Sequence, residues 1–287
     1  MKNVQIKSYC KINLYLKVLK KLDNGYHKIA SFVTFCDLHD VIKINRAKNN
    51  KDKIIFSGKF KKNISENLNT ITKLLYQLRK RNYLKKENFV INVKKNIPHG
   101  SGLGGGSSNA AALLNFFNIK MNLGINKRKL IKISESIGFD VPLCLEKKNT
   151  FLIGPKNKFV RIKKKFKFNI LIIYPNFICS TKNIYKQNRK FSQVNLKLKY
   201  IVKNRKKMIN QLKNEQNDLE NAVVKLYPQV KNIINFIKIQ NGCYFSRITG
   251  AGSACIGIFS SKKSALYAQK VINLKFPKYW SIVSKTI

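Results

Sequence analysis

The residues best suited to chemistry in this sequence form a glycine-rich segment, which reads Pro-His-Gly-Ser-Gly-Leu-Gly-Gly-Gly-Ser-Ser over residues 98–108. Five of the seven residues from 100 to 106 are glycine, and glycine readily adopts the positive φ angles that turn successive backbone N–H groups toward one anion. An alanine-rich segment follows, so the loop would lie at the positive end of a helix dipole. The natural ligand of such a loop is a chain of phosphate groups.

Two better-known glycine loops fit this segment less well. Residues 100–105 match the dinucleotide pattern G-x-G-x-x-G, but that motif needs an acidic residue about 20 positions further on, and residues 120–130 contain none. The P-loop pattern also fails, because Gly106 stands where that motif has lysine. A flexible linker is the remaining alternative, and the regular elements predicted on both sides of the loop argue against it.

The elements that position this loop are a strand before it and a helix after it. Residues 89–93 are rich in β-branched and aromatic residues, which predicts a strand. Residues 110–121 predict a largely buried helix, for which Ser107 and Ser108 can act as caps. A second helix is predicted over residues 127–137.

A β-hairpin is predicted near the N-terminus. Apolar residues alternate with polar ones over residues 12–18, a turn signal follows at residues 23–25, and a returning strand is expected over residues 28–35. Lys11 and Asn13 would therefore share the face that points away from the core. Taken alone, such a lysine is most simply a solvated strand residue.

Composition narrows the class of protein. The 287 residues are 44% hydrophobic, enough for two ordinary domains with real cores. We find no apolar stretch near the ~20 residues of a membrane span and no signal-peptide core. The six cysteines are scattered without a C-x-x-C pair, which predicts a reducing, cytoplasmic location and argues against a zinc site.

The formal net charge of +46 would ordinarily suggest nucleic acid as a partner. However, only eight of the 58 basic residues are arginine, the residue best suited to bidentate phosphate and base contacts. The lysines are also spread along the chain, and the abundance of Lys, Asn and Ile resembles a coding bias toward A and T. We therefore expect no specific nucleic-acid partner, although a positive field would attract polyphosphate substrates.

Three motifs together resemble those of the GHMP kinases, which include galactokinase, homoserine kinase and mevalonate kinase. The segment Cys-Lys-Ile-Asn-Leu-Tyr-Leu at residues 10–16 is similar to their first motif, the glycine loop to their second, and Thr-Gly-Ala-Gly-Ser-Ala-Cys at residues 249–255 to their third. The motifs occur in the family's order over nearly the whole chain. Cys10, Asn109 and Phe139 depart from residues common in the family, and none of the three removes a group that the chemistry needs.

Further features resemble the members of this family that act on a cytidine diphosphate of methylerythritol. They are Asp-Asn-Gly-Tyr-His at residues 23–27, Gly-Phe-Asp-Val-Pro at residues 138–142 and Asn-Asp-Leu-Glu at residues 217–220. The resemblance implies phosphoryl transfer from ATP to the C2 hydroxyl of the methylerythritol moiety, in the non-mevalonate route to isoprenoid precursors. Such transfers depend on positioning and charge stabilisation.

The resemblance also implies roles for individual residues. Asp140 would be the general base and Lys11 would lie beside it, keeping it charged and favouring the developing alkoxide. Mg²⁺ carried by ATP would offset the phosphate charge, with no dedicated metal cluster in the protein. The ATP-binding loop would comprise Pro98, His99, Gly100, Ser101, Gly102, Leu103, Gly104, Gly105, Gly106, Ser107 and Ser108. The substrate-binding residues would be Asn13, Tyr26, His27, Thr181 and Tyr185, with Tyr26 and Tyr185 stacking on the cytosine and His27 hydrogen-bonding to it.

Several of these residues have plainer interpretations. Asp140 follows a helix stop and precedes Val-Pro, so it could cap the next helix, and both roles could coexist. His27 could be a surface histidine, Tyr26 a packing residue, and the segment with Tyr185 a polar loop with one packed tyrosine. The glycine turn at residues 250–253, after a strand predicted over 244–248, could be a tight link between a strand and a helix.

The fold class implied by the resemblance is α+β with two domains. Residues 1–155 would form a domain similar to the second domain of ribosomal protein S5, and residues 156–287 a ferredoxin-like domain, with the active site in the cleft between them. Residues 151–161 would be the crossover, residues 170–174 a strand, and residues 186–213 a basic helix and loop. We expect a monomer or weak homodimer that binds no membrane.

Three other functions stay open at this point. Another kinase of the same family, acting on homoserine or mevalonate, would not need the Tyr26–His27 element or Tyr185. A basic nucleic-acid-binding protein would bind in a salt-sensitive manner that does not depend on Asp140. A degenerate ATP-binding module would not need both Lys11 and Asp140.

Overall fold

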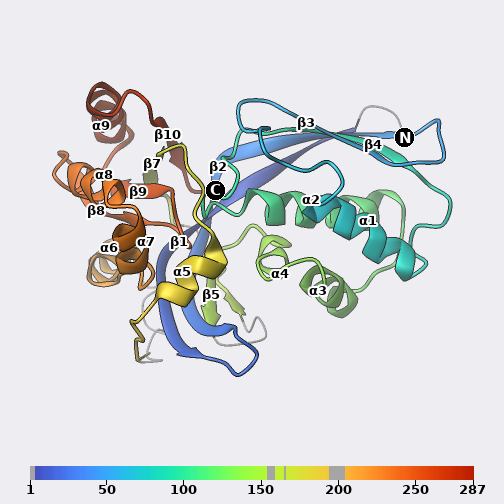
Figure 1. Cartoon of the computed structure of the whole chain (residues 1–287), viewed down its shortest axis with the longest axis horizontal. Helices are drawn as coiled ribbons and strands as arrows, with labels where there is room; N and C mark the ends of the chain where they lie inside the picture. The colour runs from blue at the N-terminus through green and yellow to red at the C-terminus, as the bar shows by residue number, and fades with distance from the viewer. Residues whose placement is uncertain (1–3, 154–158, 165, 194–203) are drawn as a thin grey trace. The chain divides into compact units, whose positions relative to one another are not determined.

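The computed structural model describes residues 4–153, 159–164, 166–193 and 204–287. The described chain forms two compact units (Figure 1). The first unit comprises the described residues of 1–11, 38–99 and 104–147, and the second those of 12–37, 100–103 and 148–287. Each unit is built from three separate stretches of the chain. The predicted boundary between two domains at residue 155 is a different kind of division, and it stays a prediction.

Two long antiparallel strands contribute residues to both units. They are β1 (Val4–Lys21) and β2 (His27–Arg46), and they pair with each other. The predicted hairpin and its turn are confirmed, with Gly25 at a φ of 80°, but both strands run further than the alternating pattern indicated. Lys11 and Asn13 do not face solvent as predicted: both are 4% exposed, because β1 is covered on both faces from Cys10 to Leu16.

The first unit places helices beside a small sheet. In it β4 (Phe89–Lys94) pairs antiparallel with residues 41–46 of β2 and parallel with β3 (Lys53–Ser57). The strand predicted over residues 89–93 is thus confirmed. The helices of this unit are α1 (Thr70–Lys80), α2 (Gly105–Lys120), α3 (Lys127–Glu135) and the single turn α4 (Val141–Cys144).

Helix α2 is buried on most of its surface, as predicted. Phe117 of α2 packs on Phe89 of β4 with ring centroids 4.8 Å apart, and both side chains are fully buried. Such an aromatic pair fixes a helix firmly against a sheet. The helix begins five residues before its predicted start, and the reason lies in the glycine loop described below.

The second unit contains a four-stranded antiparallel sheet in the order β10-β7-β9-β8. Numbered along the chain within this sheet, the strand order is 4-1-3-2, which together with the intervening helices is the ferredoxin-like arrangement. Its strands are β7 (Asn169–Tyr174), β8 (Cys243–Ile248), β9 (Cys255–Phe259) and β10 (Trp280–Lys285). Its helices are α5 (Thr181–Gln187), α6 (Arg205–Asn214), α7 (Glu220–Leu226), α8 (Gln229–Lys238) and α9 (Lys262–Lys275).

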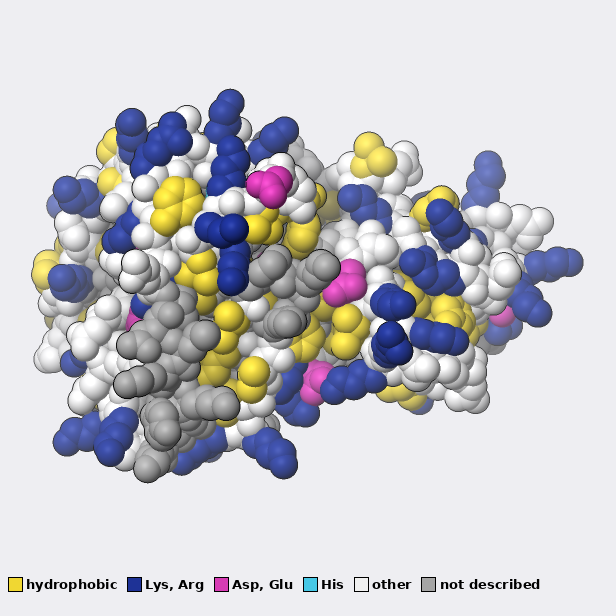
Figure 2. Space-filling model, turned by 90° about the horizontal axis from the view of Figure 1, so that it is seen from below, with side chains coloured by type: hydrophobic (Ala, Val, Ile, Leu, Met, Phe, Trp, Pro, Cys, Tyr) yellow, Lys and Arg dark blue, Asp and Glu magenta, His cyan; other side chains and the backbone are white. Residues whose placement is uncertain are grey.

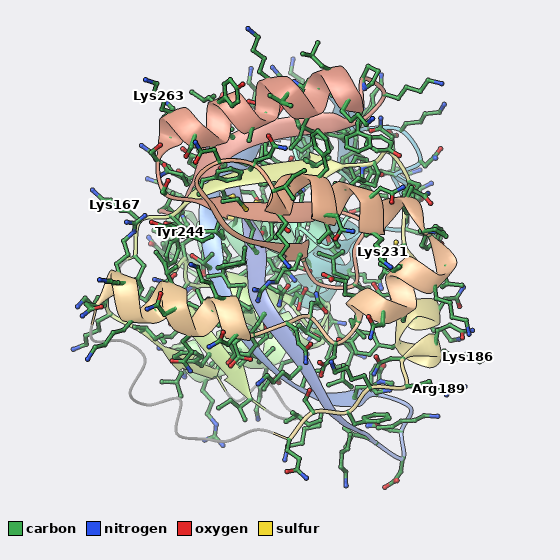
Figure 3. All side chains as sticks on the ribbon, turned by 90° about the vertical axis from the view of Figure 1, so that its left-hand side faces the viewer. Lys167, Lys186, Arg189, Lys231, Tyr244 and Lys263 are labelled. Atoms are coloured by element: carbon green, nitrogen blue, oxygen red, sulfur yellow. The ribbon has the colours of Figure 1, made fainter. Side chains whose placement is uncertain are left out.

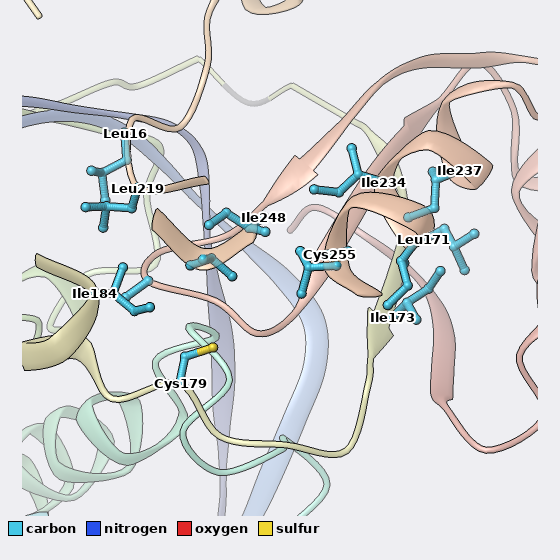
Figure 4. Packing of buried hydrophobic residues seen from close by; sticks show 14 of the residues in the cluster. Leu16, Leu171, Ile173, Cys179, Ile184, Leu219, Ile234, Ile237, Ile248 and Cys255 are labelled. Carbon is cyan, nitrogen blue, oxygen red and sulfur yellow. The ribbon is translucent and has the colours of Figure 1, made fainter. Parts of the chain in front are cut away.

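Apolar side chains from sheet and helices form one core in this unit (Figure 4). Leu171 and Ile173 of β7 contribute to it, together with Ile234 and Ile237 of α8. The i, i+3 spacing on α8 turns one apolar face to the sheet. The strands predicted over residues 170–174 and 244–248 are confirmed by β7 and β8.

The crossover expected over residues 151–161 contains two strands in the part that the structure describes. Residues 151–153 belong to β5 (Thr150–Ile153), which pairs antiparallel with β6 (Phe159–Arg161) within the second unit, and residues 154–158 lie outside the described residues. The predicted helix and loop over residues 186–213 is borne out only in part, by the end of α5 and by α6, and residues 194–203 lie outside the described residues. Across the described chain, no helix has the length and hydrophobicity to span a membrane.

Candidate active site

The end of the glycine loop becomes the N-terminus of α2 in the first unit. Gly104 is the N-cap residue at a φ of 67°, and no side chain forms a capping hydrogen bond there. Ser107 and Ser108 therefore do not cap the helix as predicted: they lie in its first turn, because the left-handed Gly104 lets the helix begin at Gly105. This end of α2 has the features of an anion site, namely N–H groups without a side-chain cap at a positive helix dipole.

Lys11 lies against this loop. A Cβ atom on Gly104 would stand 2.4 Å from Cγ of Lys11, so only glycine fits the position both by space and by φ. The aliphatic part of Lys11 thus packs on the loop while its ammonium group extends past it. The first motif and the glycine loop meet here, as the resemblance implies.

The ammonium group of Lys11 reaches Asp140. Its Nζ lies 3.2 Å from Oδ2 of Asp140, with the lysine side chain 5% exposed and the aspartate side chain 42% exposed. Asp140 is the N-cap residue of α4 by position, and its backbone oxygen accepts a hydrogen bond from Cys144 N at 3.2 Å. Its side chain makes no capping hydrogen bond, so the carboxylate is directed to Lys11 and to solvent.

The middle of the glycine loop belongs to the second unit and lies against the third motif. A Cβ on Gly102 would stand 2.1 Å from the backbone oxygen of Thr249 and 3.1 Å from that of Gly252. The backbone oxygen of Ser101 accepts a hydrogen bond from Ala254 N at 3.0 Å. The turn at residues 250–253 joins β8 to β9 and does not lead into a helix. Its backbone packs against Gly102 of the glycine loop.

Asn13 is held by hydrogen bonds in the second unit. Its backbone N–H donates to Oγ1 of Thr249 at 2.9 Å, and its Nδ2 donates to Oγ of Ser31 at 2.8 Å. Nearby, Asn217 Nδ2 donates to the backbone oxygen of Gly250 at 2.8 Å. Motifs one and three are therefore tied together through hydrogen bonds that fix the orientation of Asn13.

Two of the predicted nucleotide-binding side chains meet in the second unit. The rings of His27 and Tyr185 are 4.9 Å apart between centroids and tilted by 34°. Because the two rings contact each other, they leave no space for a base between them. Tyr26 is 53% exposed, and Thr181 is the exposed first residue of α5.

Both histidines of the predicted site favour the neutral form. Burial, followed by the positive charge of Lys21, lowers the pKa of His27 below its usual 6.5. Partial burial, followed by the charge of Lys95, lowers the pKa of His99 in the same way. At neutral pH each ring therefore has one nitrogen that donates and one that accepts a hydrogen bond.

Most side chains of the loop are buried, whereas that of His99 is exposed and that of Ser107 is half-buried. Pro98, Ser101, Leu103 and Ser108 are buried. A ligand of this loop would therefore meet backbone N–H groups for the most part, as expected for a phosphate site built on glycine. Among the described residues, no group of three or more His, Cys, Asp or Glu side chains could hold a metal ion.

The sequence interpretation missed a buried ion pair beside this loop, between Lys95 and Asp40. Nothing in the sequence separates Lys95 from the other 49 lysines, and Asp40 is one of twelve acidic residues. The contact joins β2 to the end of β4, which only the tertiary structure brings together.

On the face drawn in Figure 2, the basic side chains do not form one patch. Figure 2 shows lysine and arginine side chains scattered over that face among other residue types. In the second unit Lys186, Lys231 and Lys263 come from α5, α8 and α9, and Lys167 comes from the segment before β7 (Figure 3). A nucleic-acid interface would instead concentrate such residues along one face or groove.

Comparison with known proteins agrees with the motifs. The family model for the GHMP kinases N terminal domain matches residues 69–148, and that for the GHMP kinases C terminal domain matches residues 198–278. The chain is 41% identical to a 4-diphosphocytidyl-2-C-methyl-D-erythritol kinase of Pelagibacter ubique (strain HTCC1062), over all of both chains. It is 33% identical to the enzyme of that name from Caldicellulosiruptor saccharolyticus, over 92% of this chain and 90% of the relative.

Solved structures share the fold. A crystal structure of 4-(cytidine 5'-diphospho)-2C-methyl-D-erythritol kinase matches with a TM-score of 0.78 at 20% identity, covering 99% of this chain and 100% of that one. Homoserine kinase from Cytophaga hutchinsonii matches with a TM-score of 0.76 at 14% identity, covering 100% of this chain and 95% of that one. At these identities the solved structures establish the fold, while the curated relatives establish the group within the family. The chain belongs to the GHMP kinase family, within the group of the 4-diphosphocytidyl-2-C-methyl-D-erythritol kinases.

Proposed function

We propose that this protein transfers the γ-phosphoryl group of ATP to the C2 hydroxyl of 4-(cytidine 5'-diphospho)-2-C-methyl-D-erythritol, giving the 2-phosphate and ADP. The names of the curated relatives, one of them 41% identical over the whole chain, support this substrate. The single observation that carries the chemistry is the Lys11–Asp140 pair beside the N-terminus of α2. In the first unit it joins a proton acceptor and a buried positive charge to the end of the glycine loop from which α2 begins.

Asp140 would accept the proton of the attacking hydroxyl. Its half-exposed carboxylate can be reached by a substrate, and its lone pairs are not used in helix capping. General-base catalysis by a positioned carboxylate contributes about 10²- to 10⁴-fold to a rate. Lys11 would hold the carboxylate in place and stabilise the negative charge that develops on the hydroxyl oxygen.

The loop of residues 98–108 would bind the phosphates of ATP through backbone N–H groups. The helix start at Gly105, without a side-chain cap, supports this role. Mg²⁺ would enter with the nucleotide, which suits a hard cation that takes its oxygen ligands from phosphates and water. When bound, it would offset the charge of the phosphoryl group being transferred.

The cytidine moiety would bind at the aromatic residues of the second unit. His27, with one donor and one acceptor nitrogen at neutral pH, suits the hydrogen-bonding edge of cytosine. Tyr185 packs on His27 and would limit its orientation, and the exposed ring of Tyr26 offers a stacking surface. Asn13 and Thr181 would contribute polar contacts to the substrate. A binding site for homoserine or mevalonate would not need these aromatic residues.

The test is an ADP-release assay on the purified protein with Mg-ATP and three candidate acceptors. We expect turnover with the cytidyl substrate and none with homoserine or mevalonate. The Asp140→Asn variant should lose turnover while remaining folded, and Glu135→Gln, which changes an exposed carboxylate of α3, is the matched control. Turnover of homoserine or mevalonate instead would overturn the substrate, and turnover in Asp140→Asn would overturn the base.

We also infer that the protein acts in the cytoplasm as a monomer or weak homodimer, without a specific nucleic-acid or membrane partner. The six free cysteines support a reducing compartment. The scattered surface charge supports salt-sensitive, nonspecific binding at most. Sedimentation analysis and RNA-binding assays over a range of salt concentrations would test both statements.

A further inference from the structure

Two oppositely charged residues are buried together in the first unit, away from Asp140. Asp40 of β2 is 0% exposed and Lys95, which directly follows β4, is 3% exposed. The ammonium group of Lys95 donates to Oδ2 of Asp40. Oδ1 of the same carboxylate accepts hydrogen bonds from Asn96 N at 2.8 Å and Ile97 N at 2.9 Å. One carboxylate thus holds three consecutive residues.

These three residues lead directly into the glycine loop at Pro98. Asp40 therefore fixes the backbone at the point where the strand has ended and the loop has not yet begun. The other end of the same loop also meets this pair. A Cβ on Gly105 would stand 3.2 Å from Nζ of Lys95, so the ammonium group lies against the first residue of α2.

The stability of the fold alone does not explain this arrangement. Burying two charges carries a desolvation cost that a well-packed apolar pair would avoid. A positive charge at the N-terminus of a helix is also unfavourable, because the helix dipole is positive there. The pairing with Asp40 offsets part of both costs, and an anion at the helix N-terminus would offset a further part. Lys95 is thus placed where it opposes the empty loop and favours the loaded one.

We propose that the Asp40–Lys95 pair is a positioning element for ATP, in which Asp40 fixes the entry of the phosphate loop and Lys95 places a permanent positive charge behind the N-terminus of α2. Neither residue would touch the reacting atoms. This inference rests on the proposed function, because it assigns the pair to the ATP phosphates of that reaction.

The decisive variant replaces both charges by neutral side chains of similar size, Asp40→Asn with Lys95→Met. Asparagine keeps an acceptor for the two backbone N–H groups, so the double variant removes charge with little loss of packing. Direct binding of Mg-ATP and of adenosine is measured by calorimetry. We expect the Kd for Mg-ATP to rise about tenfold or more, and the Kd for adenosine to change less than about twofold.

Three further variants complete the experiment. Lys94→Met removes the charge of the neighbouring exposed lysine and should leave ATP affinity unchanged. Lys95→Arg keeps the charge and should restore affinity for Mg-ATP to within about threefold of the wild type. If the double variant lacks a cooperative unfolding transition, Lys95→Gln takes its place, since glutamine can still donate to Asp40.

The NMR signal of His99 gives a second readout that does not depend on activity. Lys95 lowers the pKa of His99, so removing the charge should raise that pKa in the double variant and leave it unchanged in Lys94→Met. An unchanged Kd for Mg-ATP, or equal losses for ATP and adenosine, would overturn the positioning role. A wild-type protein that binds no Mg-ATP would instead overturn the proposed function itself.

Discussion

Lys11–Asp140 and Lys95–Asp40 are both lysine–aspartate pairs of the first unit, and both lysines lie at the start of α2, yet the two carboxylates have different surroundings. The side chain of Asp140 is 42% exposed and forms no capping hydrogen bond. That of Asp40 is 0% exposed and accepts hydrogen bonds from two backbone N–H groups as well as from Lys95.

Residue type therefore does not decide the role of an ion pair in this protein. A carboxylate that can meet a substrate and has lone pairs available can accept a proton from it. A carboxylate that is fully buried and saturated by hydrogen bonds can only hold its surroundings in place. We therefore assign chemistry to the first pair and positioning to the second, and the following predictions test this contrast.

The largest expected effect is that of Asp140→Asn on turnover. Removing the proton acceptor should lower kcat by about 10²- to 10⁴-fold, since the hydroxyl would lose its general base. ATP affinity should change little, because Asp140 does not cap α2. Single-turnover kinetics beside ATP-binding measurements would check both statements, and a kcat within about tenfold of wild type would remove the distinction between the two pairs.

For the stability of the fold we expect the opposite order, with the larger effect from the pair that contains Asp40. Asp40→Asn leaves the buried Lys95 without its counterion and should lower the free energy of unfolding by about 3–5 kcal/mol. Asp140→Asn should lower it by less, because the carboxylate of that pair is 42% exposed and water can take its place beside Lys11. Urea unfolding of the two variants would decide, and an equal loss in both would contradict the assignment.

Two neighbouring glycines, Gly104 next to Lys11 and Gly105 next to Lys95, allow the surroundings of the two lysines to be compared through stability. Gly104→Ala places a Cβ at positive φ and 2.4 Å from Cγ of Lys11, which should cost about 1–3 kcal/mol of stability. Gly105→Ala meets Ile97 at 3.1 Å and Lys95 at 3.2 Å, but alanine is a better helix former than glycine. Its net effect on stability should stay within about 1 kcal/mol. Thermal unfolding of both variants would rank the two positions.

The smallest expected effect concerns pH and the second unit. Because burial and Lys21 lower the pKa of His27 below 6.5, more than half of the rings are neutral at that pH, and KM for the cytidyl substrate should begin to rise at a lower pH than an ordinary histidine would give. Below that pH, protonation removes the acceptor nitrogen and KM should rise a few-fold. The same lowered pKa means that folding stability from this residue is present above pH 6.5 and is lost as pH falls through the folded-state pKa.

A pH profile of KM from about pH 8 to about pH 5 would check this behaviour, with a His27→Gln variant as the control that has no titrating ring. A KM that already rises near pH 7 in the wild type, but not in His27→Gln, would show that the ring titrates at or above its ordinary pKa.

Much of the fold could be predicted from local patterns. The strand at residues 89–93, the hairpin and the buried helix after the glycine loop depend on residue periodicity and turn residues, which act over a few positions. The start of α2 could not be predicted in this way. It depends on Gly104 taking a left-handed conformation against Lys11, a residue more than ninety positions away.

The residues available for chemistry could be identified from the sequence alone. They are a glycine loop suited to phosphate, a lysine and an aspartate in motifs that resemble those of the GHMP kinases, and aromatic residues near a hairpin turn. Only the tertiary structure decided which partners these residues have. It directs Asp140 to Lys11 and not to its own helix, packs Tyr185 on His27, and selects Lys95 from 50 lysines to pair with Asp40. The reason is physical: local sequence sets backbone preferences, whereas burial and ion pairing depend on which distant segments the fold brings into contact.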